Sequence, residues 1–175
     1  MRRLALVIVV LFSSFVAFDL SKISRNAPPL VDRSERADLI IIRKSERSLK
    51  LIRKNTEIRS YTVSLGRNPS GHKQQEGDKK TPEGRYFIDF RNQRSAYHLA
   101  LRISYPNAVD SAVAAARHVP PGSDIMIHGI RNGLGFLGGL HRLLDWTNGC
   151  VAVTNTEIED LWKFVDIGTP VEIRP

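Results

Sequence analysis

Cys150 is the single cysteine of this 175-residue chain, and its surroundings point to chemistry. It follows Gly149 in a turn-like Thr-Asn-Gly sequence and comes shortly before a predicted helix. Backbone N–H groups near a helix start stabilise a thiolate, and the same donors can hold an oxyanion. A lone cysteine is also a small apolar residue that fits a protein core. The sequence therefore leaves two interpretations of Cys150, a reactive nucleophile and a buried core residue.

A thiol nucleophile needs a base, and His128 is the candidate. It ends an apolar strand directly before Gly129, where a side chain can emerge into a cleft. Because side chains alternate along a strand, His128 faces away from its neighbour Ile127 and need not lie in the core. A cysteine paired with a histidine carries out acyl transfer through a thioester. We also expect an ion pair with imidazolium to lower the thiol pKa below its usual value of about 8.5.

Metal and nucleotide chemistry have weaker support. The five histidines include no pair at i, i+4 and no HExxH motif, so no catalytic metal is expected. The glycines of residues 133–138 spell G-x-G-x-x-G, but this string lacks the βαβ setting of a dinucleotide site. We interpret residues 133–140 as a flexible segment whose apolar side chains ride on glycine hinges and cover a cleft as a lid.

The elements that must position these residues are mainly strands. Alternating apolar residues predict strands along the chain, and a polar loop of residues 66–82 separates the third from the fourth. Hairpin turns are expected at 46–47 and 55–56. The predicted strands lie around residues 39–42, 49–52, 60–65, 86–90, 97–103, 125–127 and 171–173.

Two short helices complete the predicted domain. Asn107 is placed to cap an Ala-rich stretch that runs to Arg117. Thr154 and Glu157 have the spacing of a capping box, which starts a second helix. That helix carries one apolar stripe, formed by Ile158, Leu161, Trp162 and Val165. The fold class is therefore mainly β, a β-rich α+β domain with two short helices.

The N-terminal segment indicates export. Residues 4–18 are free of charge and follow Arg2 and Arg3, which is typical of a signal peptide or an N-terminal membrane anchor. Residues 19–37 are polar and predict a linker, and residues 38–175 form the single domain.

The net charge of +8 has two interpretations, simple solubility and attraction to an anionic partner such as a cell-wall polymer. Zinc-finger spacing and RNA-binding signatures are absent from the sequence, and export makes nucleic acid an unsuitable partner. With one cysteine the chain cannot form an internal disulfide.

The order of the motifs resembles the L,D-transpeptidase catalytic domain of the YkuD type. Ile-His-Gly at 127–129 precedes Thr-Asn-Gly-Cys-Val at 147–151, with the cysteine twenty-two residues after the histidine. The segments 77–84 and 104–107 are similar to two further family stretches, and the resemblance covers about residues 38–174. It implies a mixed β-sandwich or barrel.

The resemblance also implies a function. Members of this family are exported bacterial enzymes of the cell envelope, in the periplasm or at the outer face of the cytoplasmic membrane, and act on peptidoglycan stem peptides. They cleave an L,D bond through a cysteine thioester and use neither a metal nor an organic cofactor. Carried over, Cys150 is the nucleophile and His128 the base. Gly149 and Thr147 form the turn and the oxyanion region, and a backbone carbonyl, which the sequence does not identify, orients the histidine.

Two departures from the family pattern bear on substrate recognition. Ala152 stands where an arginine is common, so we expect a methyl group in the pocket and the loss of a carboxylate clamp. Asn148 replaces a frequent histidine. Arg131 and Arg142 are candidates to replace the clamp, and Gly129 and Asn148 are further candidates for substrate binding. Three functions stay open: transfer to an amine, hydrolysis by an L,D-endopeptidase or carboxypeptidase, and a non-catalytic cell-wall-binding module.

Overall fold

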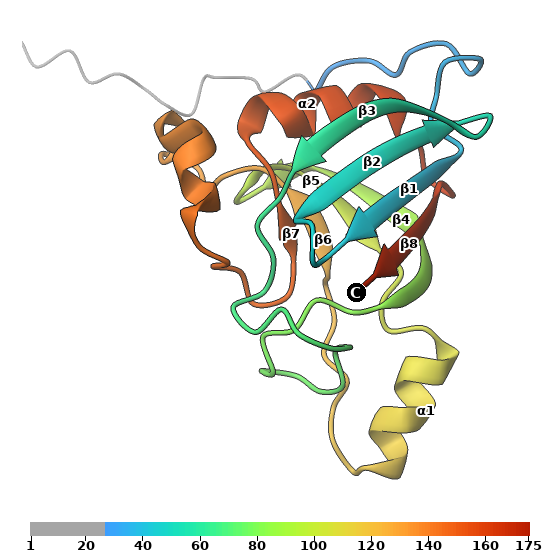
Figure 1. The fold of residues 1–175 in the computed structure, drawn as a ribbon, viewed down its shortest axis with the longest axis vertical. Helices are drawn as coiled ribbons and strands as arrows, with labels where there is room; N and C mark the ends of the chain where they lie inside the picture. Colours follow the sequence, from blue (N-terminus) through green and yellow to red (C-terminus); the bar gives the residue numbers. More distant parts are fainter. Residues whose placement is uncertain (1–26) are drawn as a thin grey trace, which may run out of the picture.

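An eight-stranded sheet forms the body of the protein in a computed structural model that describes residues 27–175 (Figure 1). The signal or anchor predicted for residues 4–18 lies outside the described residues. The strand order is β3-β2-β1-β8-β4-β5-β6-β7. The elements are β1 (Leu39–Arg43), β2 (Ser48–Arg53), β3 (Thr56–Thr62), β4 (Gly84–Ser95), β5 (His98–Ile103), α1 (Ala108–Ala116), β6 (Met126–His128), the 3₁₀ helix η2 (Gly135–Leu143), β7 (Val151–Ala152), α2 (Asn155–Phe164) and β8 (Pro170–Arg174).

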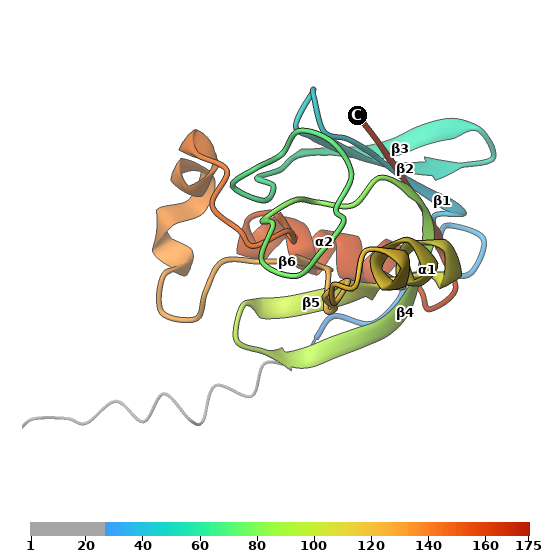
Figure 2. The same cartoon turned by 90° about the horizontal axis from the view of Figure 1, so that it is seen from below.

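The sheet bends around α2. One half contains β1, β2, β3 and β8, and the other contains β4, β5, β6 and β7 (Figure 2). Strand β8 joins the halves, because it pairs in parallel with β1 and antiparallel with β4. Alternating burial along β1 and β2 directs Ile40, Ile42, Leu49 and Leu51 into the core. The prediction of a mainly β domain is confirmed.

Both predicted α-helices are present with the expected caps. The Asn107 side chain accepts hydrogen bonds from Val109 and Asp110 at the start of α1. At the start of α2 the Thr154 hydroxyl accepts from the Glu157 N–H, and the Glu157 carboxylate accepts from the Thr154 N–H. The apolar stripe of α2 is buried between the two halves of the sheet, as its spacing predicts.

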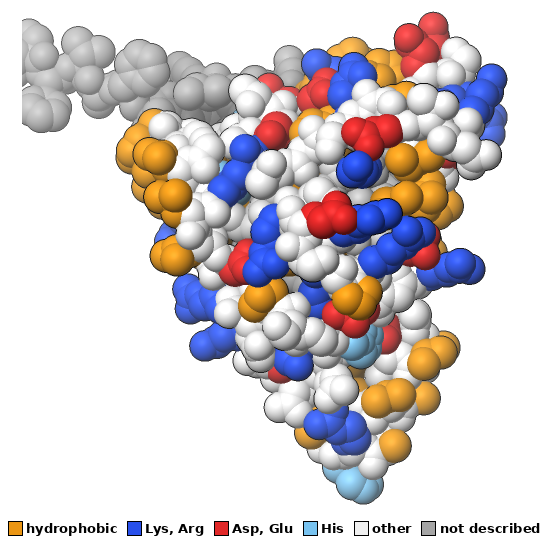
Figure 3. Space-filling view, in the orientation of Figure 1, with side chains coloured by type: hydrophobic (Ala, Val, Ile, Leu, Met, Phe, Trp, Pro, Cys, Tyr) orange, Lys and Arg blue, Asp and Glu red, His pale blue; other side chains and the backbone are white. Residues whose placement is uncertain are grey.

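The glycine-rich segment, which was predicted to be a flexible lid, forms the 3₁₀ helix η2. The helix is broken at Gly138, whose φ of 48° and ψ of −131° interrupt the helical path. Five large apolar side chains of this region are exposed, and Figure 3 shows hydrophobic side chains gathered where Figure 1 places η2. They are Leu134, Phe136, Leu140, Leu143 and Leu144. The domain thus has a third short helix besides the two predicted ones.

The described half of the predicted linker is attached to the domain. Val31 N–H donates to the carbonyl of Lys163 and Ala37 N–H to that of Phe164, both at 2.9 Å. Arg36 forms an ion pair of 2.7 Å with Asp166. Residues 31–37 therefore run along the C-terminal end of α2. Within residues 27–175 no helix has the length and apolar character to cross a membrane.

Candidate functional site

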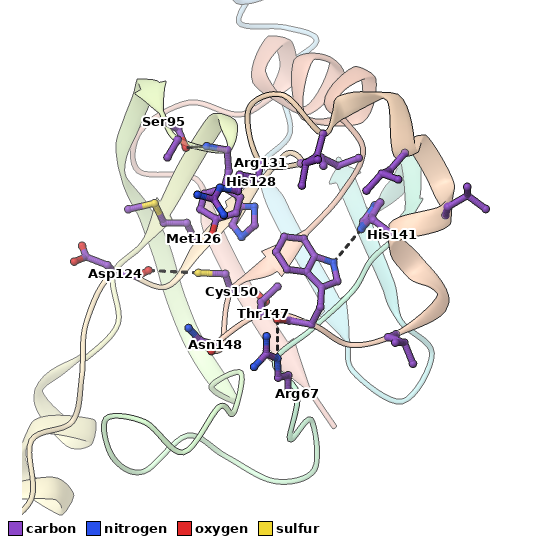
Figure 4. Close-up of a pocket in the computed structure, with 18 of the residues that line it drawn as sticks. Arg67, Ser95, Asp124, Met126, His128, Arg131, His141, Thr147, Asn148 and Cys150 are labelled. Carbon is purple, nitrogen blue, oxygen red and sulfur yellow. Dashed lines mark hydrogen bonds between the residues drawn. The ribbon is translucent and has the colours of Figure 1, made fainter.

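Strands β6 and β7 bring His128 and Cys150 to one place in the fold. They pair in parallel, with Ile127 opposite Val151, so that Cys150 precedes β7 beside the strand that ends in His128. Both side chains line a cavity of about 830 Å³ (Figure 4). Apolar residues form most of its wall, among them Tyr97, Ile130, Leu134, Leu137, Leu140 and Trp146.

The orientation of His128 makes it competent as a base. Its Nδ1 lies 2.6 Å from the carbonyl oxygen of Gly129. Since a carbonyl only accepts hydrogen bonds, Nδ1 carries the proton, and the unprotonated Nε2 keeps its lone pair. Tyr97 packs against the imidazole with ring centroids 4.6 Å apart, and Trp146 packs edge-on at 5.8 Å. Gly129 thus supplies the orienting carbonyl that the sequence left unidentified.

Burial keeps both members of the pair neutral. It lowers the pKa of His128 to about 4, and the hydrogen bond to Gly129 only partly opposes this shift. Burial also raises the pKa of the Cys150 thiol, against a smaller opposing effect from the Met126 backbone. The ion pair expected from the sequence is therefore disfavoured in the resting protein, because both charged forms would lose hydration.

The helix start is not the feature that acts on Cys150. Strand β7 separates Cys150 from α2, and the side chain of Thr154 already caps the first turn of that helix. The Cys150 thiol instead donates to the carbonyl of Asp124, with Sγ and O 3.5 Å apart, as Figure 4 shows. The expected stabilisation of a thiolate by the start of α2 is thus corrected.

Thr147 and Gly149 shape the turn that carries the thiol. The Thr147 hydroxyl accepts from the Gly149 N–H at 3.1 Å and donates to the Cys150 carbonyl at 2.7 Å. Because this bond occupies the Gly149 N–H, Gly149 acts in the turn rather than as an oxyanion donor. Its φ is +131°, and a Cβ at this position would lie 2.6 Å from the carbonyl oxygen of Lys80. Only glycine fits here without a shift of the backbone.

We expect Gly149→Ala to destabilise the fold by about 3 kcal/mol and to misplace the thiol, because the methyl group meets backbone. Thermal unfolding and the rate of Cys150 acylation measure the two effects. Gly168→Ala is the matched control, since Gly168 also has positive φ, +89°, but nothing within 4 Å of its added Cβ. Equal losses of stability in the two variants would mean that φ alone, and not the contact with Lys80, requires glycine.

The candidate substrate-binding residues separate into two groups. Asn148 and Arg131 line the cavity with exposed side chains, and their contact with substrate stays a prediction. Gly129 is buried and acts through its carbonyl on His128. Arg142 does not line the cavity, because its guanidinium pairs with Glu157 in the capping box of α2. The expectation that Arg142 replaces the carboxylate clamp is corrected.

Position 152 also differs from its expectation. Ala152 is fully buried, exchanges two backbone hydrogen bonds with Ser64, and does not line the cavity. The expected methyl group in the pocket is therefore wrong. A cation that the sequence did not indicate, Arg67, does line the cavity, with its Nε 3.1 Å from the carbonyl oxygen of Trp146. Its position after Gly66, at the start of a polar loop, was the only available signal.

No metal centre accompanies this site in the part of the chain that the structure describes, where no three His, Cys, Asp or Glu side chains are grouped as ligands.

Comparisons with known proteins point to one family. The family model of the L,D-transpeptidase catalytic domain, YkuD, matches residues 37–173. YafK of Escherichia coli strain K12, which carries the name of an L,D-transpeptidase, is 32% identical over 178 residues. The alignment covers 94% of this chain and 64% of YafK, so the chain spans somewhat less than two thirds of that relative.

Two solved structures share the fold. Bd1075 of Bdellovibrio bacteriovorus has a TM-score of 0.56 and 28% identity, over 83% of this chain and 50% of that one. The helical cell shape determining protein Pgp2 of Campylobacter jejuni, as its K307A mutant, has a TM-score of 0.61 and 23% identity, over 87% of this chain and 52% of that one. Since the family model covers most of the described residues, the chain belongs to the family of L,D-transpeptidase catalytic domains.

Proposed function

We propose that this protein is a cysteine-dependent L,D-transpeptidase that transfers the acyl group of a peptidoglycan stem peptide to an amine. Family membership supports a peptidoglycan-modifying enzyme of the L,D-transpeptidase type. The observation that carries the finer proposal is the placement of Cys150 and His128 in one cavity, with the Nε2 lone pair of His128 left available by the Gly129 carbonyl. In this proposal Cys150 is the nucleophile and His128 the general base.

The first half-reaction forms the thioester. Sγ of Cys150 attacks the carbonyl carbon of the L,D bond while Nε2 of His128 accepts the thiol proton. The C–N bond then breaks, and the leaving amine takes this proton from Nε2. The carbonyl oxygen becomes an oxyanion in between, and the backbone N–H of Cys150 itself is the nearest donor in sequence. Thr147 holds this segment in place through its bond to the Cys150 carbonyl.

The second half-reaction releases the thioester. An acceptor amine attacks the thioester carbon, Nε2 of His128 takes one proton from it, and the C–S bond breaks. The proton returns from Nε2 to Sγ, which restores the neutral pair. Water in place of the amine gives hydrolysis with the same proton transfers, so the same residues serve both outcomes. Stem peptides lie outside the cytoplasm, which agrees with export through residues 4–18 as a signal or an anchor.

The test is incubation of the full chain with a disaccharide-tetrapeptide, followed by mass spectrometry of the products. We expect cross-linked dimers that have lost one D-Ala. Trimmed monomers without dimers would make the protein an L,D-hydrolase, and the absence of both would leave a cell-wall-binding module. Cys150→Ala is the control, because alanine is also small and apolar but has no thiol. Both products should disappear in this variant.

A further inference from the structure

We infer that Arg67 anchors the C-terminal carboxylate of the stem peptide beside Cys150. This inference rests on the proposed function and assigns the recognition of one substrate group. The wall of the cavity is largely apolar, and the Lys, Arg, Asp and Glu side chains that line it are Arg67, Asp124 and Arg131. An anion that enters this cavity is therefore drawn to an arginine.

Arg67 is held against the chain that leads to the nucleophile. Its Nε donates to the carbonyl of Trp146, and its backbone N–H donates to the carbonyl of Thr147, both at 3.1 Å. Figure 4 shows Arg67 below Thr147 and Cys150. Gly66 permits a close approach to the turn before Cys150, because a Cβ there would lie 3.1 Å from the Cα of Gly149, and it would also lie 2.1 Å from the carbonyl oxygen of Lys79.

The fixed guanidinium still presents a free edge. The Nε bond to Trp146 orients the plane, and no ion pair within residues 27–175 involves the Nη groups of Arg67. A planar guanidinium binds a carboxylate through two parallel hydrogen bonds. Because Arg67 is already positioned, binding costs little further side-chain entropy.

The other two arginines of the site fit this role less well. The guanidinium of Arg142 is paired with Glu157 and lies outside the cavity wall. Arg131 lines the cavity and is exposed, as Arg67 is, but its side chain forms no hydrogen bond or ion pair among the described residues that would fix its direction. Arg67 therefore takes the role of the carboxylate clamp for which many family members have an arginine at the position of Ala152. It does so from a segment more than eighty residues before Cys150.

The covalent structure of the substrate indicates which of its carboxylates Arg67 binds. The residue released from an L,D bond carries its carboxylate on the carbon next to the scissile nitrogen. In a stem tetrapeptide this is the C-terminal carboxylate, the anionic group nearest to the attacking sulfur. Arg67 and Cys150 line the same cavity, so one bound peptide can meet both.

The test compares binding of a stem tetrapeptide acid with that of its C-terminal amide. The full chain carrying Cys150→Ala binds without turnover, and the change in Trp fluorescence reports occupancy, since Trp146 lines the cavity. We expect the acid to bind about tenfold to a hundredfold more tightly than the amide. Arg67→Gln in this background should bring the ratio close to one, and Arg67→Lys, which keeps the charge without the planar fork, should give an intermediate ratio.

Arg85→Gln is the matched control, because Arg85 is an exposed arginine of β4 outside the cavity wall, and it should keep the wild-type ratio. Equal binding of acid and amide, no binding of either, or a ratio that survives Arg67→Gln would each overturn the inference. A ratio lost in Arg131→Gln but kept in Arg67→Gln would assign the carboxylate to Arg131 instead.

Turnover of the disaccharide-tetrapeptide is measured separately. Selective binding of the acid without turnover would contradict only the proposed function. Turnover without selective binding would contradict only the role of Arg67.

Discussion

A carbapenem is expected to add one adduct to the wild-type chain and none to Cys150→Ala. The thiol attacks the β-lactam carbonyl, the ring C–N bond breaks, and the ring nitrogen takes the proton that His128 accepted. Because Cys150 is the single cysteine, the mass of the intact protein assigns the adduct without digestion. In the same variant, turnover of stem peptide should fall by at least about 10³-fold, as for the loss of a covalent nucleophile.

A simple alkylating agent provides the contrast to this acylation. Burial raises the pKa of the Cys150 thiol, so iodoacetamide should react slowly with the folded protein at neutral pH and rapidly after unfolding in denaturant. Acylation is expected to differ, because in the proposed mechanism His128 removes the proton during the attack. A folded wild-type protein that resists the carbapenem, while its unfolded form is alkylated once, would show that Cys150 is a structural core residue.

The sequence was sufficient for features that depend on local patterns. The cap of α2 by Thr154 and Glu157 follows from a four-residue spacing, and the stripe of α2 from a helical period. In both cases the residues that decide the outcome are neighbours in the chain. The placement of Cys150 and His128 in one cavity is different, because the two residues are twenty-two positions apart and the family resemblance, not a local pattern, led to that expectation.

The features that failed depend on segments far apart in the chain. Ala152 was expected in the pocket, yet the chain at Ser64 covers it through two backbone hydrogen bonds. Nothing in the sequence indicates a partner for Arg142, but in the folded protein Arg142 forms an ion pair with Glu157. Arg67 received no role, because only folding carries its loop to Trp146. The order of charged residues along the chain does not show which of them come together in the folded protein.

The protonation of Cys150 and His128 is the most instructive difference. A cysteine and a histidine of this spacing predict an ion pair, but an ion pair requires hydration or compensating charges. His128 lies under Tyr97 and Trp146 instead, and burial shifts both pKa values toward the neutral forms. Desolvation is a property of the packed cavity, so it becomes visible only with the fold.

Because Cys150 and His128 are both neutral, His128→Gln should strongly change how the acylation rate of Cys150 depends on pH. In the wild type, Nε2 stays unprotonated down to the pKa of His128, about 4, so the acylation rate should be nearly constant from about pH 5 to 8. Without the base, only the thiolate reacts, and its fraction rises tenfold for each pH unit below the raised pKa of Cys150. The logarithm of the variant's rate should therefore rise with a slope of one.

The wild type should exceed His128→Gln most at pH 5, and the ratio of their carbapenem acylation rates should shrink about tenfold per pH unit toward pH 8. His141→Gln is the matched control, since His141 lines the same cavity but its Nδ1 accepts from the Trp146 indole at 3.3 Å. It should keep the flat profile whatever its rate. Parallel pH profiles for wild type and His128→Gln would show that His128 takes no part in the proton transfer. A wild-type acylation rate that falls below pH 7 would show that Cys150 and His128 form an ion pair, contrary to the effect of their burial.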